Sequence, residues 1–223
     1  MFLEAPREQL QEVYVSESFL EKCSCREHLE EVGYEVVSDS VFSKISDTCT
    51  PQGVLCVLKQ FHYNIEEMLR DKAPLFLLLE NIQDPGNLGT MLRTGEGAGV
   101  SGIIMSRDTV DLYNPKVIRS TMGSIYRVPF YYADDFAAAV HQVQQAGVSV
   151  YAAHLRGKNS YACQDYTKGT AFLIGNEGNG LREETAELAD CYIRIPMEGK
   201  VESLNAAVAS SILMYEAHRQ RAI

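Results

Sequence analysis

The sequence of 223 residues lacks the features that define several protein classes. It has no tryptophan, and no apolar run approaches the roughly 18 residues that cross a bilayer, which excludes a transmembrane helix. Residues 1–12 contain no basic segment followed by an apolar one, so we expect no signal peptide. Six cysteines are too few and too scattered for a disulfide framework. We therefore expect reduced thiols in a cytoplasmic protein.

Positive charge is also scarce. The chain has 20 Lys and Arg against 30 Asp and Glu, a net charge of −10, and residues 1–62 alone hold 5 against 11, a net of −6. This excludes a protein that coats nucleic acid by charge alone. The composition, 46% apolar and 22% charged, is typical of a globular protein with a core. The cations that we expect to form a basic path are Arg93, Lys116, Arg119, Arg127, Arg156 and Lys158.

Residues 1–62 are predicted to form a small α/β domain. Apolar and β-branched runs predict strands at 12–15, 34–37 and 54–58, the last buried on both faces. Helices are expected over 16–23, with Ser16 as N-cap, and over 40–45. The charged residues 63–73 are expected to be a linker to a second domain.

Residues 74–223 alternate apolar strands with helices, which predicts an α/β domain with a mostly parallel sheet covered on both faces. The first helix is expected to start with Asp84 as N-cap and Pro85 at its first position. The predicted strands are 75–79, 103–105, 126–131, 148–152, 171–174 and 192–195, and the other helices are 115–120, 134–146 and 204–219.

Three loops rich in glycine and asparagine follow predicted strands, at residues 80–89, 175–181 and 195–205. Each by itself is compatible with a simple turn. Glu177 alone could be a solvated charge, Arg93 a surface charge, and Ser203 the N-cap of the last helix. Because ligands bind at the carboxyl edge of parallel sheets, three such loops at that edge indicate a functional site.

Other site patterns are not supported. Residues 97–102 read G-x-G-x-x-G, but these glycines end a helix and enter a strand, whereas a dinucleotide fingerprint follows a strand and opens a helix. An oxidoreductase would depend on this misplaced pattern. The five histidines are isolated from one another in the sequence, and we expect no metal site.

The three loops resemble the SpoU/TrmH branch of the SPOUT superfamily, the RNA 2′-O-ribose methyltransferases. The resemblance lies in the spacing of Asn81, Asn87 and Arg93, in IGNEGNGL at 174–181 and in IPMEGKVESLNAAVA at 195–209, and it covers about residues 74–223. It implies a C-terminal trefoil knot, a homodimer and S-adenosyl-L-methionine as cofactor. Residues 1–62 resemble the small RNA-binding domain that often precedes this domain, truncated at its start.

The resemblance also implies roles for individual residues. It places the catalytic positions at Arg93, Asn87, Glu177, Ser203 and Asn205, and the cofactor-binding positions at Gly175, Asn176, Gly178, Ile195, Met197 and Leu204. Since a guanidinium stays protonated, we expect Arg93 to orient the ribose and stabilise developing alkoxide, held by hydrogen bonds from Asn87 and Ser203.

The expected reaction is methyl transfer from S-adenosylmethionine to a ribose 2′-hydroxyl, in ribosomal RNA rather than transfer RNA because of the appended N-terminal domain. Two alternatives remain open from the sequence. One is a transfer RNA 2′-O-methyltransferase, and the other is a catalytically silent RNA-binding or ribosome-assembly protein with the same fold.

Overall fold

The computed structural model describes residues 1–222, which form two compact units, divided between Phe61 and His62. The first unit contains a three-stranded sheet and the second a seven-stranded sheet. Among the described residues, no helix has both the length and the apolar character that a bilayer crossing requires.

The first unit is built on a sheet of order β2-β1-β3, in which β1 runs parallel to β2 and antiparallel to β3. Its elements are η1 (Phe2–Glu4), β1 (Leu10–Ser16), α1 (Glu17–Lys22), α2 (Arg26–Val32), β2 (Glu35–Val37), α3 (Asp39–Ile45) and β3 (Val54–Leu58). Ser16 caps α1 as predicted, accepting a hydrogen bond from the Phe19 N–H. The prediction that 54–58 is buried on both faces is wrong, because β3 is an edge strand of a small sheet and remains partly exposed.

The second unit is built on a sheet of order β6-β5-β4-β9-β7-β10-β8, in which every neighbouring pair is parallel. The mostly parallel α/β sheet predicted from the sequence is confirmed. Its elements are α4 (Ile65–Met68), β4 (Leu75–Leu79), α5 (Pro85–Ala98), β5 (Gly102–Ser106), α6 (Pro115–Thr121), η2 (Ser124–Tyr126), β6 (Phe130–Ala133), α7 (Phe136–Gln145), β7 (Ser149–Ala153), β8 (Asn159–Ser160), η3 (Tyr161–Cys163), β9 (Thr170–Ile174), α8 (Glu183–Ala186), β10 (Cys191–Arg194) and α9 (Ala206–Arg221).

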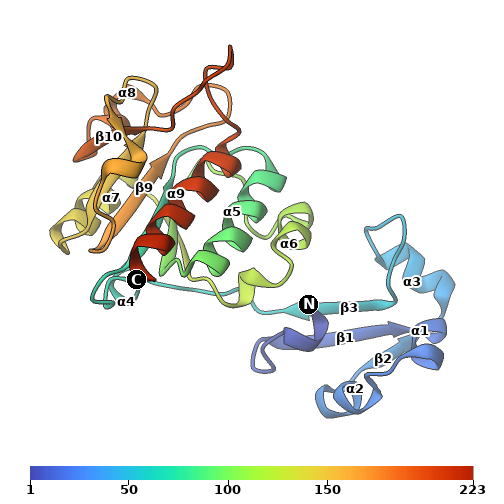
Figure 1. Cartoon of the computed structure of the whole chain (residues 1–223). Coiled ribbons are helices and arrows are strands. Elements are labelled where there is room, and N and C mark those ends of the chain that lie inside the picture. Colours follow the sequence, from blue (N-terminus) through green and yellow to red (C-terminus); the bar gives the residue numbers. More distant parts are fainter. Residues whose placement is uncertain (223) are drawn as a thin grey trace. The chain divides into compact units, whose positions relative to one another are not determined.

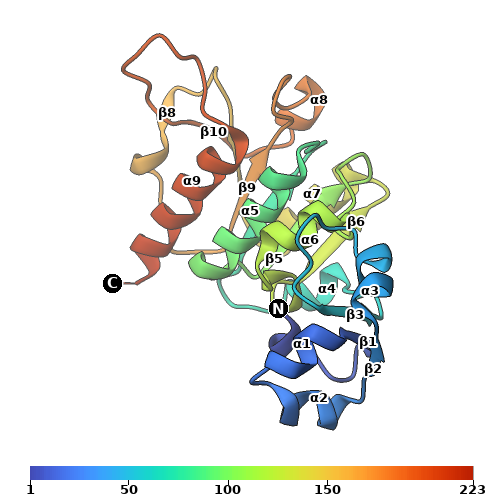
Figure 2. The same cartoon turned by 90° about the vertical axis from the view of Figure 1, so that its right-hand side faces the viewer.

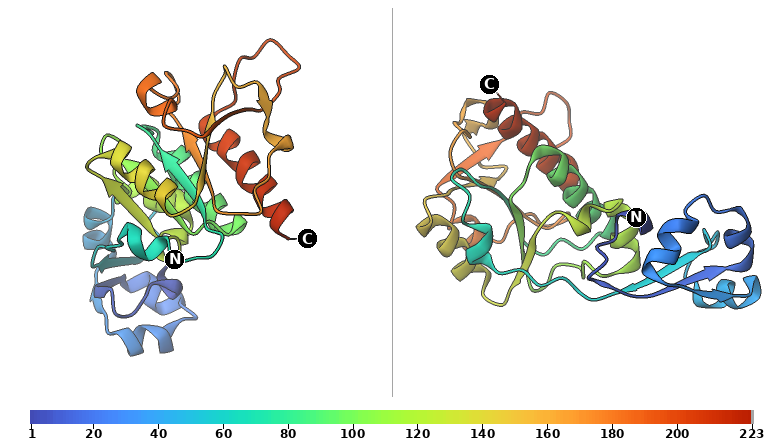
Figure 3. Two further views of the ribbon diagram at one scale, coloured as in Figure 1. Left: turned by 90° about the vertical axis from the view of Figure 1, so that its left-hand side faces the viewer. Right: turned by 90° about the horizontal axis from the view of Figure 1, so that it is seen from below.

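Helices cover both faces of this sheet. Every residue of β4, β5 and β9 is buried, as expected for central strands covered on two sides. On one face, α5 packs against α6 and α9, and the views in Figures 1 and 2 show α5 and α9 side by side. On the other face, Phe76 and Leu78 join a core that includes α4 and α7. Figure 3 (right) shows the sheet between these two layers.

Two predicted segments take another form in the structure. Residues 126–131 were expected to be one strand, but residues 124–126 form η2, and β6 begins at Phe130. Here Gly123 adopts a positive φ of 97°, and the Ser124 carbonyl accepts hydrogen bonds from the next turn, so the chain coils before it extends. The expected linker 63–73 contains α4, whose Ile65 and Met68 are buried in the core of the second unit.

The start and end of α5 agree with the sequence prediction. The Asp84 side chain accepts a hydrogen bond of 2.7 Å from the Asn87 N–H, and Pro85 occupies the first turn. Gly99 ends the helix in the left-handed conformation, with φ 77°, and β5 starts three residues later at Gly102. The G-x-G-x-x-G pattern therefore joins a helix to a strand, opposite to a dinucleotide fingerprint.

Candidate functional site

The site lies where the strand order changes direction. From β4 the chain proceeds outward through β5 and β6, and the later strands β9, β7, β10 and β8 lie on the other side of β4. At such a switch point, the loops after two neighbouring strands diverge and leave a crevice. The residues that follow β4 and β9 are Glu80–Asp84 and Gly175–Leu181, and the Glu80 N–H donates to the Ile174 carbonyl at 2.9 Å.

Glu177 connects the second loop to the start of α5. Its carboxylate accepts hydrogen bonds from the backbone N–H groups of Gln83 (3.1 Å) and Asp84 (3.0 Å) and from Asn87 Nδ2 (3.0 Å). Partial burial acts to raise the pKa of Glu177, but the hydrogen bonds from Asn87, Asp84 and Gln83 outweigh it, and the pKa is lowered. Glu177 is therefore an ionised carboxylate at neutral pH.

Asn205 connects the third loop to the same cluster. Its Nδ2 donates a hydrogen bond of 3.0 Å to Asn87 Oδ1, and its Oδ1 accepts from the N–H groups of Ala207 (2.9 Å) and Val208 (3.2 Å). Asn205, and not Ser203, is thus the N-cap of α9, which begins at Ala206. Both ends of the Asn87 amide are engaged, so Glu177, Asn87 and Asn205 form one hydrogen-bonded chain across all three loops.

Asn176 shapes the second loop from within. Its Oδ1 accepts from the N–H groups of Gly178 (2.9 Å) and Asn179 (3.0 Å), and its Nδ2 donates to the Asn81 carbonyl at 2.8 Å. A Cβ on Gly175 would lie 2.2 Å from the carbonyl carbon of Gly180. The two ends of the loop can therefore approach each other this closely only if residue 175 is glycine. The Asn176 hydrogen bonds and the close approach at Gly175 together hold residues 175–181 in this conformation.

Arg93 and Ser203 stand apart from this cluster. Both are exposed, and the side chain of neither makes a hydrogen bond or ion pair with another described residue. The expectation that Asn87 and Ser203 hold Arg93 is not met in this structure, because the Asn87 amide bonds through its nitrogen to Glu177 and through its oxygen to Asn205. The guanidinium and the hydroxyl are available to a ligand.

The loop after β10 has the chemistry that an adenine ring requires. Ile195, Met197 and Leu204 are partly buried apolar side chains, and the described structure gives residues 195–204 no backbone hydrogen bond. Apolar walls with free backbone donors and acceptors fit an adenosine group. Met197 also lines a cavity of about 490 Å³ together with Leu155, Gly157 and Pro196. The basic residues Arg156, Lys158 and Arg194 and the polar residues Asn159 and Ser160 also line that cavity.

Sequence reasoning missed a buried acid beside the site. The Glu80 side chain is 1% exposed and accepts hydrogen bonds from the Arg182 N–H (2.8 Å), from Arg182 Nε (2.7 Å) and from the Thr185 hydroxyl. It fixes the end of the glycine loop to the end of β4. The signal in the sequence was an acidic residue directly after the five apolar residues of β4, since a charge next to a buried strand needs a partner.

Part of the predicted basic path is neutralised. Arg127 pairs with Glu96, and Arg156 pairs with Glu183. These contacts lower the pKa of both glutamates, chiefly through the arginine hydrogen bonds. Lys116 and Arg119 lie on α6 as exposed side chains. Lys158 and the unpredicted Arg194 remain as cations beside Met197.

Comparison with known proteins shows which family has these three loops. A model of the SpoU rRNA Methylase family matches residues 74–215, which includes all three loops. The chain belongs to this family. It is an S-adenosylmethionine-dependent RNA methyltransferase, and the enzyme class and cofactor predicted from the sequence are confirmed.

Three relatives show how the SpoU methylase fold is shared. The chain is 35% identical over 180 residues, 81% of its length and 70% of the relative, to the 23S rRNA (guanosine(2553)-2′-O)-methyltransferase RlmP of Bacillus subtilis. The AdoMet-bound rRNA methyltransferase from Sinorhizobium meliloti is 32% identical with a TM-score of 0.81, over 95% of this chain and 80% of the other. The A. aeolicus TrmH/SpoU tRNA modifying enzyme is 30% identical with a TM-score of 0.62, over 70% of this chain and 80% of the other.

Proposed function

We propose that this SpoU methylase transfers the methyl group of S-adenosylmethionine to a ribose 2′-hydroxyl of ribosomal RNA. The observation that carries the proposal is the hydrogen-bonded chain Glu177–Asn87–Asn205, which joins the three loops at the crevice of the sheet. Arg93 follows Asn87 on the same helix, with a charged group that no described residue engages. RlmP, whose name specifies 2′-O-methylation of ribosomal RNA, supports the same acceptor.

The extent of the structural matches favours ribosomal over transfer RNA. The S. meliloti rRNA methyltransferase matches 95% of this chain, so its match includes the first unit, whereas the A. aeolicus tRNA enzyme matches 70%. The second unit, His62–Ile223, makes up a share of the sequence similar to the 70% that the A. aeolicus enzyme matches. We propose that the first unit, Met1–Phe61, binds the RNA substrate and adapts the catalytic unit to it.

The residues of the third loop would hold the cofactor. Ile195, Met197 and Leu204 would enclose the adenine, and Gly175, Asn176 and Gly178 would support the remaining cofactor through their backbone. When bound, the cofactor supplies an electrophilic methyl group on a sulfonium. The chain must align the ribose oxygen with that methyl group, and alignment of this kind contributes up to about 7–11 kcal/mol to lowering a barrier.

Arg93 would bind the ribose and the adjacent phosphate. As the ribose oxygen bonds to the methyl carbon, the carbon–sulfur bond breaks, the sulfur retains the electron pair and the hydroxyl proton passes to solvent. The guanidinium, always protonated, would stabilise the partial negative charge on that oxygen. Asn87 and Asn205 would act as positioning residues, because their side chains hold α5 and α9 against the Glu177 loop. Ser203, exposed and unpaired, would contact the substrate.

We also propose that the chain is knotted and dimeric. The support for a trefoil knot is the match of the SpoU rRNA Methylase family model to residues 74–215, the part of the chain whose resemblance implies the knot. The support for a homodimer is exposed apolar surface on helices of the second unit, with Val208 and Tyr215 of α9 each 49% exposed. The six free cysteines agree with an enzyme that works in the cytoplasm.

Methyl transfer from labelled cofactor to unmodified ribosomal RNA and to transfer RNA tests the proposed function, with the labelled nucleotide mapped afterwards. Label on a ribose of ribosomal RNA is expected. Label on transfer RNA would instead establish the transfer RNA alternative. Label on neither RNA and no calorimetric affinity for S-adenosylmethionine, with binding of the same RNA retained, would support the silent RNA-binding protein.

A further inference from the structure

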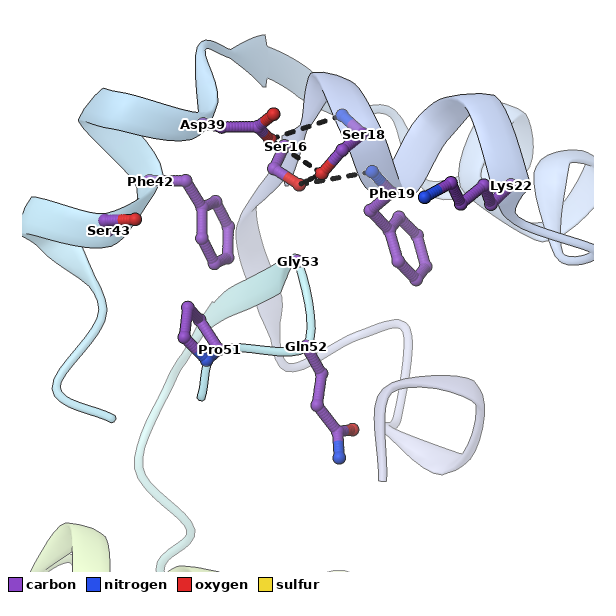
Figure 4. Close-up of a pocket in the computed structure, with 10 residues that line it drawn as sticks. All are labelled: Ser16, Ser18, Phe19, Lys22, Asp39, Phe42, Ser43, Pro51, Gln52 and Gly53. Carbon is purple, nitrogen blue, oxygen red and sulfur yellow. Dashed lines mark hydrogen bonds between the residues drawn. The ribbon is translucent and has the colours of Figure 1, made fainter. Parts of the chain in front are cut away.

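A cavity in the first unit lies outside the site described above. Its volume is about 350 Å³, and it lies between α1, α3 and the loop that precedes β3 (Figure 4). Pockets for small organic groups typically measure about 300–1,000 Å³. The cavity is therefore large enough to receive part of a ligand, and its lining decides which kind.

Two aromatic rings line this cavity. Phe19 on α1 is partly exposed, while Phe42 on α3 is 3% exposed and forms a fixed wall. Figure 4 shows the two rings on either side of Gly53. Gly53 has φ +87°, and a Cβ there would lie 2.4 Å from the Phe19 Cβ, so glycine lets the loop approach this ring closely. Unpaired bases of RNA stack on such aromatic faces.

Polar groups surround the rings. Asp39 accepts hydrogen bonds from the Ser18 N–H (3.3 Å) and hydroxyl (2.8 Å), which fasten α3 to α1 and, as the main causes, lower the pKa of Asp39. The side chains of Ser43 and Gln52 line the cavity without a hydrogen bond to another described residue. Their hydroxyl and amide groups can donate to and accept from the polar edge of a base.

Charge limits what this cavity can bind. Residues 1–62 carry a net charge of −6, which opposes binding of a polyanion along the surface. Among the described residues that line the cavity, Lys22 is the cation and Asp39, which is engaged by Ser18, is the anion, so at most one phosphate group can be matched. One accessible ring, hydrogen-bonding groups and a single cation match one nucleotide rather than a length of nucleic-acid backbone.

We propose that this cavity binds one unpaired nucleotide of the RNA substrate. The base stacks on the partly exposed Phe19, with Phe42 as the buried wall behind it, Ser43 and Gln52 contact its edge, and Lys22 contacts its phosphate. The proposal rests on the proposed function, since it makes the first unit a reader of an unpaired base in the methylated RNA. It implies a shallow dependence of RNA binding on salt concentration, because few phosphate contacts are made in this unit.

The absence of tryptophan from the chain provides a direct test. A Phe19→Trp variant has one tryptophan, at the wall of the cavity. A Val36→Trp variant places one on β2, at a residue that is 48% exposed and does not line the cavity. Each full-length variant is titrated with the four ribonucleoside 5′-monophosphates, with a single-stranded ribo-oligonucleotide and with inorganic phosphate. Saturable quenching by nucleotides is expected for Phe19→Trp and not for Val36→Trp.

Two results of this titration would overturn the proposal. One is equal behaviour of the two variants, which would show that quenching does not report on the cavity. The other is competition by inorganic phosphate as strong as that by nucleotides, which would show an anion site without base recognition. Saturation that differs among the four nucleotides would further identify the preferred base.

Methyl-transfer kinetics test the same cavity by comparing variants with the wild-type protein, which has Phe19. Stacking is worth about 1–3 kcal/mol per base, so Phe19→Ala is expected to raise the KM for RNA about 5- to 150-fold with unchanged kcat and cofactor affinity. Lys22→Gln, an exposed substitution that leaves the core intact, is expected to raise the same KM, and Val36→Ala is not. Unchanged KM in both cavity variants would refute the proposal.

The two proposals fail in distinguishable ways. If the wild-type chain methylates RNA but Phe19→Trp shows no quenching and the KM values do not change, the cavity proposal fails and the proposed function stands. If the wild-type chain transfers no methyl group but quenching saturates in Phe19→Trp alone, the cavity binds nucleotides and the proposed function fails.

Discussion

Asn205 donates its side-chain amide to the side-chain oxygen of Asn87 at 3.0 Å, although the two residues are 118 positions apart. This bond joins the N-terminal ends of α5 and α9, which pack against each other along the sheet. Because the Asn87 amide in turn donates to Glu177, one amide side chain fixes the relative positions of three loops.

Asn205→Ala and Asn205→Asp separate the two functions of this side chain. Alanine removes the cap of α9 and is expected to destabilise the protein by about 0.5–2 kcal/mol. Aspartate retains the capping oxygen but cannot donate to Asn87, so its melting temperature should stay close to that of the wild type while kcat falls. Thermal melts and methyl-transfer kinetics on both variants check this. Equal activity of Asn205→Asp and wild type would refute the positioning role.

Arg93→Lys tests the catalytic guanidinium. Lysine keeps the charge but loses the planar set of donors, so we expect kcat to fall about tenfold or more, roughly 1.4 kcal/mol in the barrier, with little change in stability. Arg119→Lys, on the exposed surface of α6, is the matched control. Turnover near that of the wild type in Arg93→Lys would exclude a role that depends on the guanidinium plane.

Glu177→Gln tests the lowered pKa of this carboxyl group. Since hydrogen bonds lower the pKa in the folded protein, ionised Glu177 stabilises the fold above the pKa of the unfolded chain, and this contribution is lost as the pH falls through the folded pKa. Wild type is therefore expected to melt at a higher temperature than Glu177→Gln at pH 7, and the gap should close toward acidic pH. A gap independent of pH would contradict this.

Glu80→Ala is expected to destabilise the second unit more than loss of a surface ion pair. It leaves the buried Thr185 hydroxyl and the Arg182 N–H without an acceptor, at about 1–3 kcal/mol for each unsatisfied group. Glu183→Ala breaks the exposed pair with Arg156 and should cost less than about 1 kcal/mol. Urea unfolding of both variants gives the comparison. Equal losses would show that the Glu80 contacts contribute nothing beyond a surface pair.

Arg221→Met tests the anchoring of the C-terminal helix. The Arg221 guanidinium donates to four carbonyl oxygens, at 2.8 Å to Tyr166 and Ala73, 3.2 Å to Pro74 and 2.6 Å to Lys168. Hydrogen bonds to charged groups contribute about 1.5–3 kcal/mol each, so a loss of several kcal/mol is expected in Arg221→Met. Arg219→Met removes the i,i+3 pair between the 62% exposed Arg219 side chain and Glu216, which is 12% exposed; it is the control and should cost less than Arg221→Met. Equal free energies of unfolding for Arg221→Met and Arg219→Met would show that Arg221 does not anchor the C-terminal helix.

Local patterns in the sequence were sufficient to predict the strand and the helix that position the site. The apolar run 75–79, the capping residue Asp84 and the glycine at 99 predict β4 and both ends of α5, because strand burial, helix capping and the left-handed helix end depend on neighbouring residues. They failed at 126–131, where Gly123 turns the chain with a positive φ and the Ser124 carbonyl accepts two backbone hydrogen bonds, so that η2 precedes β6 and the strand begins only at Phe130.

The site, too, was predicted in part from local patterns and in part only from the tertiary structure. The sequence by itself determined that Asn87, Glu177 and Asn205 belong to three loops at one edge of a parallel sheet, since the strand and helix periodicities are local. Only the tertiary structure decided that Asn87 bonds to Glu177 and Asn205 rather than to Arg93, and that Glu80 is buried against Arg182. Partners separated by about a hundred residues are selected by how the strands order in the sheet, and hydrogen-bond geometry is fixed only once that packing is complete.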